Sequence, residues 1–176
     1  SKLGTTSRWG LFASAGTNLD LKGIFKLASV EQFNFRAGYG GTGGLPFRGG
    51  LAKDRVKITR FNPNSISTEI DWLENPNLSW EKKQELNLGL DFQKGMLSVR
   101  LDWYNKTLSD WIILGRATDS FEDQFSNQGA LNASGVDIDL NIALKNSQET
   151  HFSTGLTFSI YHSEFDTIVG SPRIET

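Results

Sequence analysis

Apolar and polar residues alternate along several stretches of the chain, most clearly between residues 86 and 104. The apolar residues take every second position, at Leu86, Leu88, Leu90 and Phe92, and again at Leu97, Val99, Leu101 and Trp103. Between the two runs stands the dipeptide Lys94-Gly95. A period of two on both sides of a Gly-containing dipeptide predicts a β-hairpin with one apolar and one polar face.

The register of this hairpin follows from its turn. With Lys94 and Gly95 as the two central residues, the predicted apolar pairs are Phe92 with Leu97, Leu90 with Val99, Leu88 with Leu101, and Leu86 with Trp103. On the opposite face the same register puts Asn87 across from Asp102. It leaves Asp91 diagonal to Arg100, close enough for a cross-strand ion pair.

Similar patterns predict further strands. The predicted strands are residues 8–16, 33–42, 84–93, 96–114, 132–145 and 150–163. In residues 136–144 the alternation is cleanest, with Asp137 and Asp139 together on the polar side. The last two strands form a second hairpin, in which Leu144 pairs with Phe152, Leu140 with Leu156 and Ile138 with Phe158. The two carboxylates of Asp137 and Asp139 would be costly in a dry core and cheap on a hydrated face.

The segments between the strands differ in length. Residues 18–30 are expected to form a packed connector, either a short helical turn or a periplasmic connection. Residues 44–81 are expected to form a long irregular loop, and residues 115–131 a second long loop. In transmembrane barrels the long loops are extracellular and the short turns periplasmic. In a barrel, the two long loops would therefore lie outside the cell and Lys94-Gly95 in the periplasm.

Two architectures share this pattern. A soluble β-sandwich buries the apolar faces of its sheets against each other. A transmembrane barrel turns the apolar face to lipid and the polar face to its lumen. A lipid-crossing strand needs roughly 9–11 residues, and the run 96–114 exceeds that length. Trp103 stands where the aromatic girdle at the outer interface is expected.

Several motifs resemble those of one family. They are NPNLSWEK at 75–82, LNLGLDF at 86–92, DWYNK at 102–106, NFRAGYGGTG at 34–43, NQG at 127–129 and ASGVD at 133–137. In this order they resemble the barrel of SusC/RagA-type TonB-dependent outer-membrane transporters. The resemblance implies an all-β fold, an antiparallel transmembrane β-barrel segment of about six strands from a roughly 22-stranded barrel. Residues 1–176 would then be part of a single barrel domain. No stretch resembles a plug domain or a TonB box.

The resemblance also implies a function. Such a protein imports oligosaccharides or oligopeptides across the bacterial cell outer membrane. Its partners would be a SusD-like surface lipoprotein, the TonB complex, the plug and the remaining barrel, and membrane lipid. The basic and aromatic residues of the long loop are the predicted contacts with substrate or lipoprotein: Arg48, Arg55, Arg60, Trp72 and Trp80. The alternative is a soluble, lectin-like β-sandwich that uses Trp72, Trp80 or Trp111 as sugar platforms.

Composition narrows the remaining possibilities. The chain has no cysteine, so neither disulfides nor thiol chemistry are expected. A net charge of −2 argues against nucleic acid as a partner. No catalytic motif surrounds His151 or His162, so no enzyme, cofactor or metal site is predicted. The acidic residues Asp119, Glu122 and Asp123 match no calcium-loop spacing and are expected to be solvated surface. No signal peptide opens the chain at Ser1, so the sequence is expected to be a truncated piece.

Overall fold

The computed structural model describes residues 2–5, 9–62, 65–117, 120–146 and 151–168. In this part of the chain the structure has one short helix and eight strands. Their bounds are β1 Ser14–Asp20, α1 Leu21–Ile24, β2 Gln32–Gly44, β3 Arg55–Asn62, β4 Ser65–Trp72, β5 Glu81–Lys94, β6 Leu97–Arg116, β7 Asp123–Asn146 and β8 His151–Ile168. Within the described ranges no helix is long and apolar enough to cross a membrane.

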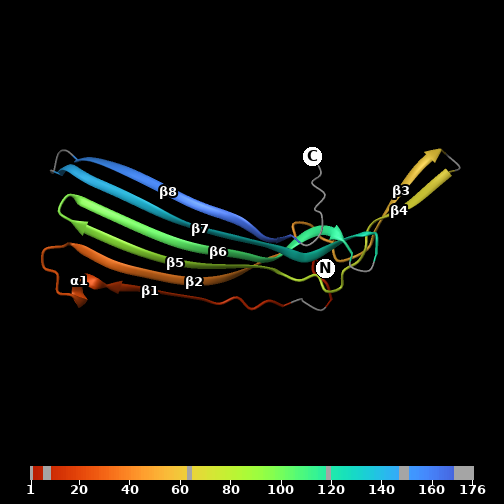
Figure 1. The fold of residues 1–176 in the computed structure, drawn as a ribbon, viewed down its shortest axis with the longest axis horizontal. Coiled ribbons are helices and arrows are strands. Elements are labelled where there is room, and N and C mark those ends of the chain that lie inside the picture. The colour runs from red at the N-terminus through yellow and green to blue at the C-terminus, as the bar shows by residue number, and fades with distance from the viewer. Residues whose placement is uncertain (1, 6–8, 63–64, 118–119, 147–150, 169–176) are drawn as a thin grey trace.

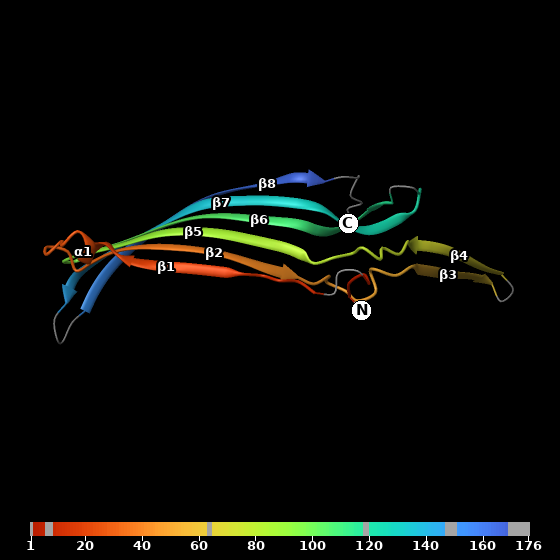
Figure 2. The same cartoon turned by 90° about the horizontal axis from the view of Figure 1, so that it is seen from below.

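Six strands form one antiparallel sheet in the order β1-β2-β5-β6-β7-β8, and β3 pairs with β4 in a separate two-stranded sheet (Figure 1). The larger sheet is a single curved layer, and the β3–β4 hairpin extends beyond one end of it (Figure 2). The sheet does not close on itself, since its edges are β1 and β8. The observed all-β antiparallel architecture agrees with the predicted fold class.

Most predicted strands are present, although several bounds were wrong. The predicted strand 8–16 begins only at Ser14 and runs on to Asp20, which shortens the expected connector 18–30. At the other end of the sheet β7 begins at Asp123 rather than near residue 132. The predicted loop 115–131 is therefore mostly strand. A strand with both faces in water needs no apolar alternation, because backbone pairing alone continues it.

The predicted turn was wrong by one residue, so each residue of β5 pairs with the β6 residue two positions beyond the predicted partner. Lys94 pairs with Leu97, so the two turn residues are Gly95 and Met96. Gly95 has φ +57°, a left-handed conformation that glycine adopts without steric cost. Because the two strands shift together, the apolar and polar faces stay as predicted. The pairs change, so that Asn87 faces Tyr104 and Asp102 faces Gly89.

The second hairpin is nearly as predicted. Leu140 pairs with Leu156 and Ile138 with Phe158, which confirms those two pairs. Leu144 does not pair with Phe152, because an irregularity between Ala143 and Lys145 leaves Lys145 opposite Phe152.

Residues 44–81 are not the irregular loop that the sequence predicted. They contain the β3–β4 hairpin, in which Val56 pairs with Ile70 and Ile58 with Thr68. At its base a small core forms against the far ends of β6 and β7. The buried core residues are Leu51, Ala52, Trp72, Leu78, Ile112 and Phe125.

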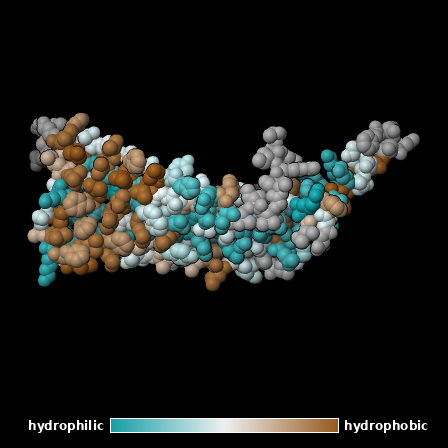
Figure 3. Space-filling model, viewed as in Figure 1, coloured by the Kyte–Doolittle hydropathy of each residue, from teal (hydrophilic) through white to brown (hydrophobic). Residues whose placement is uncertain are grey.

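The registers align apolar residues in a continuous row across all six strands. That row is Leu19, Phe35, Leu90, Leu101, Ile138 and Phe158. We call this side of the sheet the apolar face and the opposite side the polar face. The hydrophobic area is broad over the half of the sheet nearest the β5–β6 turn and gives way to polar residues toward β3 and β4 (Figure 3). No second sheet covers it in the described part of the chain.

Candidate functional site

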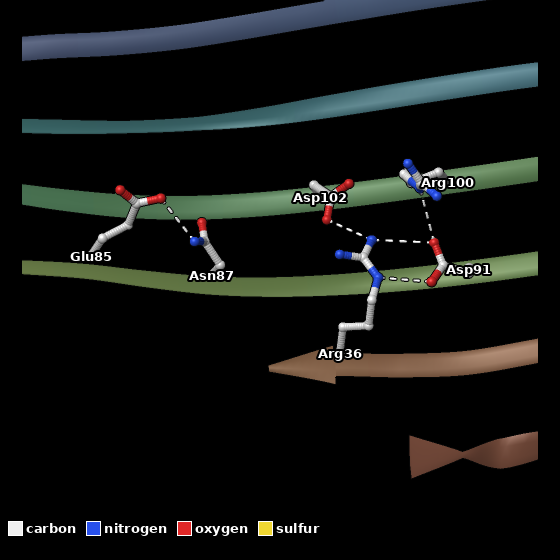
Figure 4. Close-up of polar contacts among 6 residues, drawn as sticks. All are labelled: Arg36, Glu85, Asn87, Asp91, Arg100 and Asp102. Carbon is white, nitrogen blue, oxygen red and sulfur yellow. Dashed lines mark hydrogen bonds and ion pairs between the residues drawn. The ribbon is translucent and has the colours of Figure 1, made fainter. Parts of the chain in front are cut away.

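The polar face carries an ion-pair network that joins three strands. Arg36 of β2 donates from Nε to Asp91 Oδ2 at 2.7 Å, and from Nη2 to Asp102 Oδ1 of β6 at 2.7 Å. Arg100 donates from Nε to Asp91 Oδ1 at 3.1 Å. Figure 4 shows Arg36 reaching across β5 to both carboxylates. The predicted Asp91–Arg100 pair is therefore present, with the two residues directly opposite each other rather than diagonal.

Gly89 makes this crossing possible. It lies on β5 between Arg36 and Asp102 in the register. A Cβ atom on Gly89 would lie 2.6 Å from both Arg36 Cζ and Asp102 Oδ1. A residue with a side chain would therefore occupy the space through which the guanidinium passes. The glycine within LNLGLDF is the sequence signal for this crossing.

Asp137 and Asp139 continue the polar face on β7, as predicted. Asp137 faces Asp102 and Asp139 faces Arg100. Asp139 accepts a hydrogen bond from Thr157 Oγ1 of β8 at 2.7 Å. Charged and hydroxyl groups therefore span β2 to β8 on this face, opposite the apolar row.

The small core at the base of the β3–β4 hairpin contains one of the predicted contact residues, Trp72. Trp72 is 8% exposed and packs edge-on against Phe125, with ring centroids 5.1 Å apart. Its Nε1 donates to the Lys53 carbonyl at 2.9 Å. The Arg55 guanidinium lies 4.8 Å above the Trp72 ring and 3.3 Å from Asp71 Oδ2. The structure thus brings Arg55 and Trp72 together, with Trp72 as the buried support.

The motif at 75–82 is tied to the far ends of β6 and β7 by hydrogen bonds. Asn127 Oδ1 accepts from the Ser79 amide at 2.8 Å. Its Nδ2 donates to the carbonyls of Ser79 at 3.1 Å and Asp110 at 2.7 Å. Asp110 has φ +57° and sits at the irregularity in β6. Asn127 therefore connects the loop to this bulge.

Trp80 lies apart from this core, in an open recess of about 490 Å³ beside Trp9, Phe12, Tyr39, Lys82 and Lys83. Its ring centroid is 5.8 Å from that of Phe12, in an edge-to-face arrangement. Trp80 Nε1 is buried and has no hydrogen-bond partner in the described part of the chain.

The remaining two predicted contact residues are Arg48 and Arg60. Arg48 is exposed between β2 and β3. Arg60 lies in β3 opposite Ile66, and its side chain is outside what the structure describes. Sequence reasoning missed Arg36, Gly89 and Asn127 as organising residues. The partners of Arg36 and Asn127 are far away in the sequence, so the strand order was needed to reveal them, whereas Gly89 is marked by its place in LNLGLDF.

No metal-binding group of three or more His, Asp or Glu side chains occurs within the described residues. Of the acidic residues noted in the sequence, Asp119 lies outside the described residues. Asp123 pairs with Arg116 in the β6–β7 ladder.

Comparison with known proteins gives a family match over nearly the whole chain. The model of the family "TonB dependent receptor-like, beta-barrel" matches residues 4–174. No curated protein matches the chain.

Solved structures share its fold. The structure described as "Structure of the RagAB peptide transporter" superposes with a TM-score of 0.79 at 24% identity, covering 95% of this chain and 19% of that one. The RagAB peptide importer in its "open-open" state gives a TM-score of 0.80 at 24% identity, over 94% and 19%. In the "closed-closed" state it gives 0.79 at 24%, over 96% and 19%. The present chain therefore spans about a fifth of the length of these relatives.

Proposed function

This chain belongs to the TonB dependent receptor-like β-barrel family, and we propose that it forms part of the wall of an outer-membrane importer. The observation that carries the proposal is the uncovered apolar row across six strands, backed by an ion-pair network on the other face. In a membrane barrel the first face contacts lipid and the second lines the lumen. Residues 1–176 would be one section of a single barrel domain, with plug and TonB box in other parts of the protein.

The lectin-like β-sandwich is the weaker alternative. A sandwich needs a second sheet packed about 10 Å above the apolar face. In the described residues the second sheet is the β3–β4 hairpin, which continues past the end of the larger sheet and does not cover it (Figure 2).

The proposed cargo is an oligopeptide or an oligosaccharide, taken up with a SusD-like surface lipoprotein and energy from the TonB complex. The RagAB structures are described as those of a peptide transporter and importer, which favours peptides. At 24% identity the likeness supports the fold of this chain. Cargo and partners rest on the family resemblance of the sequence.

The segment 44–81, which contains the β3–β4 hairpin, is the proposed contact surface for cargo or lipoprotein. Arg48, Arg55, Arg60 and Trp80 would make direct contacts. Trp72 would act by holding the guanidinium of Arg55, since its own ring is buried. Arg55 and Trp80 belong to different clusters, so substitutions at the two sites should act independently.

The proposal is tested in the native host with the full-length protein. Deletion of the gene should abolish growth on oligopeptides or on oligosaccharides as the sole nutrient, and loss of TonB should have the same effect. A tagged transporter extracted in detergent should copurify with a surface lipoprotein. Unchanged growth after deletion, or purification of residues 1–176 as a soluble, cooperatively melting monomer, would contradict it.

A further inference from the structure

The two faces of the sheet exchange character along the strands. Beyond Trp103 the side chains on the apolar face become polar on β6, β7 and β8, at Asn105, Ser134 and His162. On β5 the change comes one step later, since Leu86 is still apolar and Gln84 is polar. Figure 3 shows the hydrophobic area ending partway along the sheet. On β6 and β8 the polar face changes in the opposite sense, from charged or hydroxyl side chains to aromatic ones, while β5 keeps Asn87 and Glu85 there. Above the lipid the wall stands in water, which explains the polar outside but not the aromatic inside.

The first aromatic pair surrounds Gly135 of β7. Tyr104 of β6 and Tyr161 of β8 are both opposite this glycine in the ladders. A Cβ atom on Gly135 would lie 2.5 Å from Tyr104 Oη, so the phenol ring lies over the glycine. Tyr104 is two residues from Asp102, which puts it on the polar face.

The second aromatic pair lies farther out and repeats the arrangement. Trp111 of β6 is opposite Gly129 of β7. A Cβ atom there would lie 3.0 Å from the Cβ of Trp111, so the two point to the same side. Trp111 stacks on Phe165 of β8, with centroids 6.0 Å apart and an interplanar angle of 10°.

Tyr104, Trp111, Tyr161 and Phe165 form what we call the aromatic shelf. Tyr161 and Phe165 lie on β8, which is an edge strand in this section of the wall, and like Tyr104 and Trp111 they are on the lumen side. The residues between the two aromatic pairs on this face are Lys106, Leu108, Leu131, Ala133 and Ser163. Lys106 lies 4.5 Å above the Tyr104 ring and 3.6 Å from Glu85 Oε1.

We propose that the aromatic shelf is a cargo-binding surface in the outer part of the lumen, and that it takes aromatic or other apolar side chains of an oligopeptide. This proposal rests on the import function proposed above. Stacked and edge-to-face aromatic contacts supply affinity without requiring one fixed sequence. Such a surface suits a transporter that takes many peptides.

The surroundings of the shelf favour peptide over sugar. A sugar ring that stacks on an aromatic residue also needs carboxylate or amide side chains beside it for its hydroxyl groups. The nearest amide and carboxylate are those of Asn87 and Glu85 on β5, and both are already engaged: Asn87 Nδ2 donates to Glu85 Oε1 at 2.8 Å, and Lys106 lies 3.6 Å from the same oxygen. Between the two aromatic pairs the shelf otherwise offers two leucines, an alanine and a serine. These surroundings suit the binding of an apolar side chain of a peptide.

The test measures binding to the full-length transporter in detergent. The probes are a nonapeptide of Gly, Ser and Thr with one central Phe, the same peptide with Ser in place of Phe, and a glucose hexasaccharide. Wild type should bind the Phe peptide more tightly than the Ser peptide. Tyr161→Ser and Phe165→Ser should each reduce this preference by about 2- to 10-fold.

The matched controls lie on the same strand and face outward. His162→Ser and Glu164→Ala should leave the preference unchanged, and the conservative variant Tyr161→Phe should retain it. Resistance of the folded barrel to SDS shows that each variant is folded.

Each other outcome has its own meaning. If wild type and shelf variants prefer the Phe peptide over the Ser peptide equally, the shelf is not a cargo-binding surface, while the import function is unaffected. Loss of hexasaccharide binding alone in the shelf variants overturns the assignment to peptides. A wild-type transporter that binds none of the probes and supports no uptake overturns the import function, and the shelf with it.

Discussion

Single glycines decide which side chains can meet on the lumen side of this wall. Glycine in the interior of a strand is usually unfavourable relative to alanine by about 0.5–1 kcal/mol. Gly89 is an exception because the guanidinium of Arg36 occupies the space above it. Gly38, on the neighbouring strand, has nothing within 4 Å of its missing Cβ. The two positions therefore form a matched pair for experiment.

Gly89→Ala should destabilise the barrel by about 1–2 kcal/mol, because it separates Arg36 from Asp102 and leaves the part-buried carboxylate of Asp102 without this partner. Gly38→Ala should be neutral or slightly stabilising, since only the glycine penalty is removed. The measurement is the temperature at which the SDS-resistant folded band of the full-length protein converts to the unfolded one. Equal shifts in the two variants would show that the crossing of Arg36 contributes nothing.

Asn127 is the second residue whose role can be isolated. Asn127→Ala removes three hydrogen bonds to the backbone of Ser79 and Asp110 and should weaken the attachment of the loop by about 1–3 kcal/mol. We expect faster proteolysis in residues 75–80, while the SDS-resistant barrel persists. Asn132→Ala, on the same strand, serves as the control. Identical cleavage rates in both variants would be evidence against the connection.

At the scale of strands and hairpins, the sequence predicts well where lipid imposes alternation and poorly where it does not. The half of the hairpin from Leu86 to Trp103 follows the apolar period, and its faces were predicted correctly. The outer parts of β6 and β7 lack that period, as expected if both sides of the wall are in water there in the proposed membrane arrangement. Their strand structure comes from pairing between distant segments, which the sequence does not display.

The β3–β4 hairpin shows a different reason for failure. Its alternation is visible in Val56, Ile58, Ile66 and Ile70, but Pro63 and the frequent charges led to the prediction of a loop. The Arg36 network was half predicted, because Asp91 and Arg100 belong to one local hairpin. Arg36 itself joins only through the β2–β5 pairing, across a separation of 55 residues to Asp91.

The hairpin should be separable from the barrel. In the described residues β3 and β4 pair only with each other, and the hairpin is anchored at its base through Trp72. Replacing residues 56–71 by a short Gly-Ser linker should leave the SDS resistance of the barrel intact. It should weaken binding of the lipoprotein partner or cargo by about 10-fold or more, as expected when an interface loses a central contact. Loss of the folded barrel would instead show that the hairpin is part of the wall's structure.

For the whole molecule, the length of the connections sets the orientation in the membrane. The β5–β6 connection is the two-residue turn Gly95-Met96, while the segment between β2 and β5 carries a hairpin and its own core. Long connections lie outside the cell and short turns in the periplasm. Because the chain has no cysteine, single cysteines in this section can report which side each end faces. Two positions suit this purpose poorly: residue 64 lies outside the described residues, and a side chain at Gly95 would be strained at its positive φ.

Ser67→Cys on β4 and Met96→Cys in the turn are the better pair, since both positions are exposed. In intact cells a membrane-impermeant maleimide should label the cysteine at position 67 and not the one at position 96. After permeabilisation of the outer membrane both should react, which controls for intrinsic reactivity. Labelling at position 96 alone in intact cells would show that the wall has the opposite orientation in the membrane. The aromatic shelf would then lie at the periplasmic end of the lumen, where cargo leaves rather than enters.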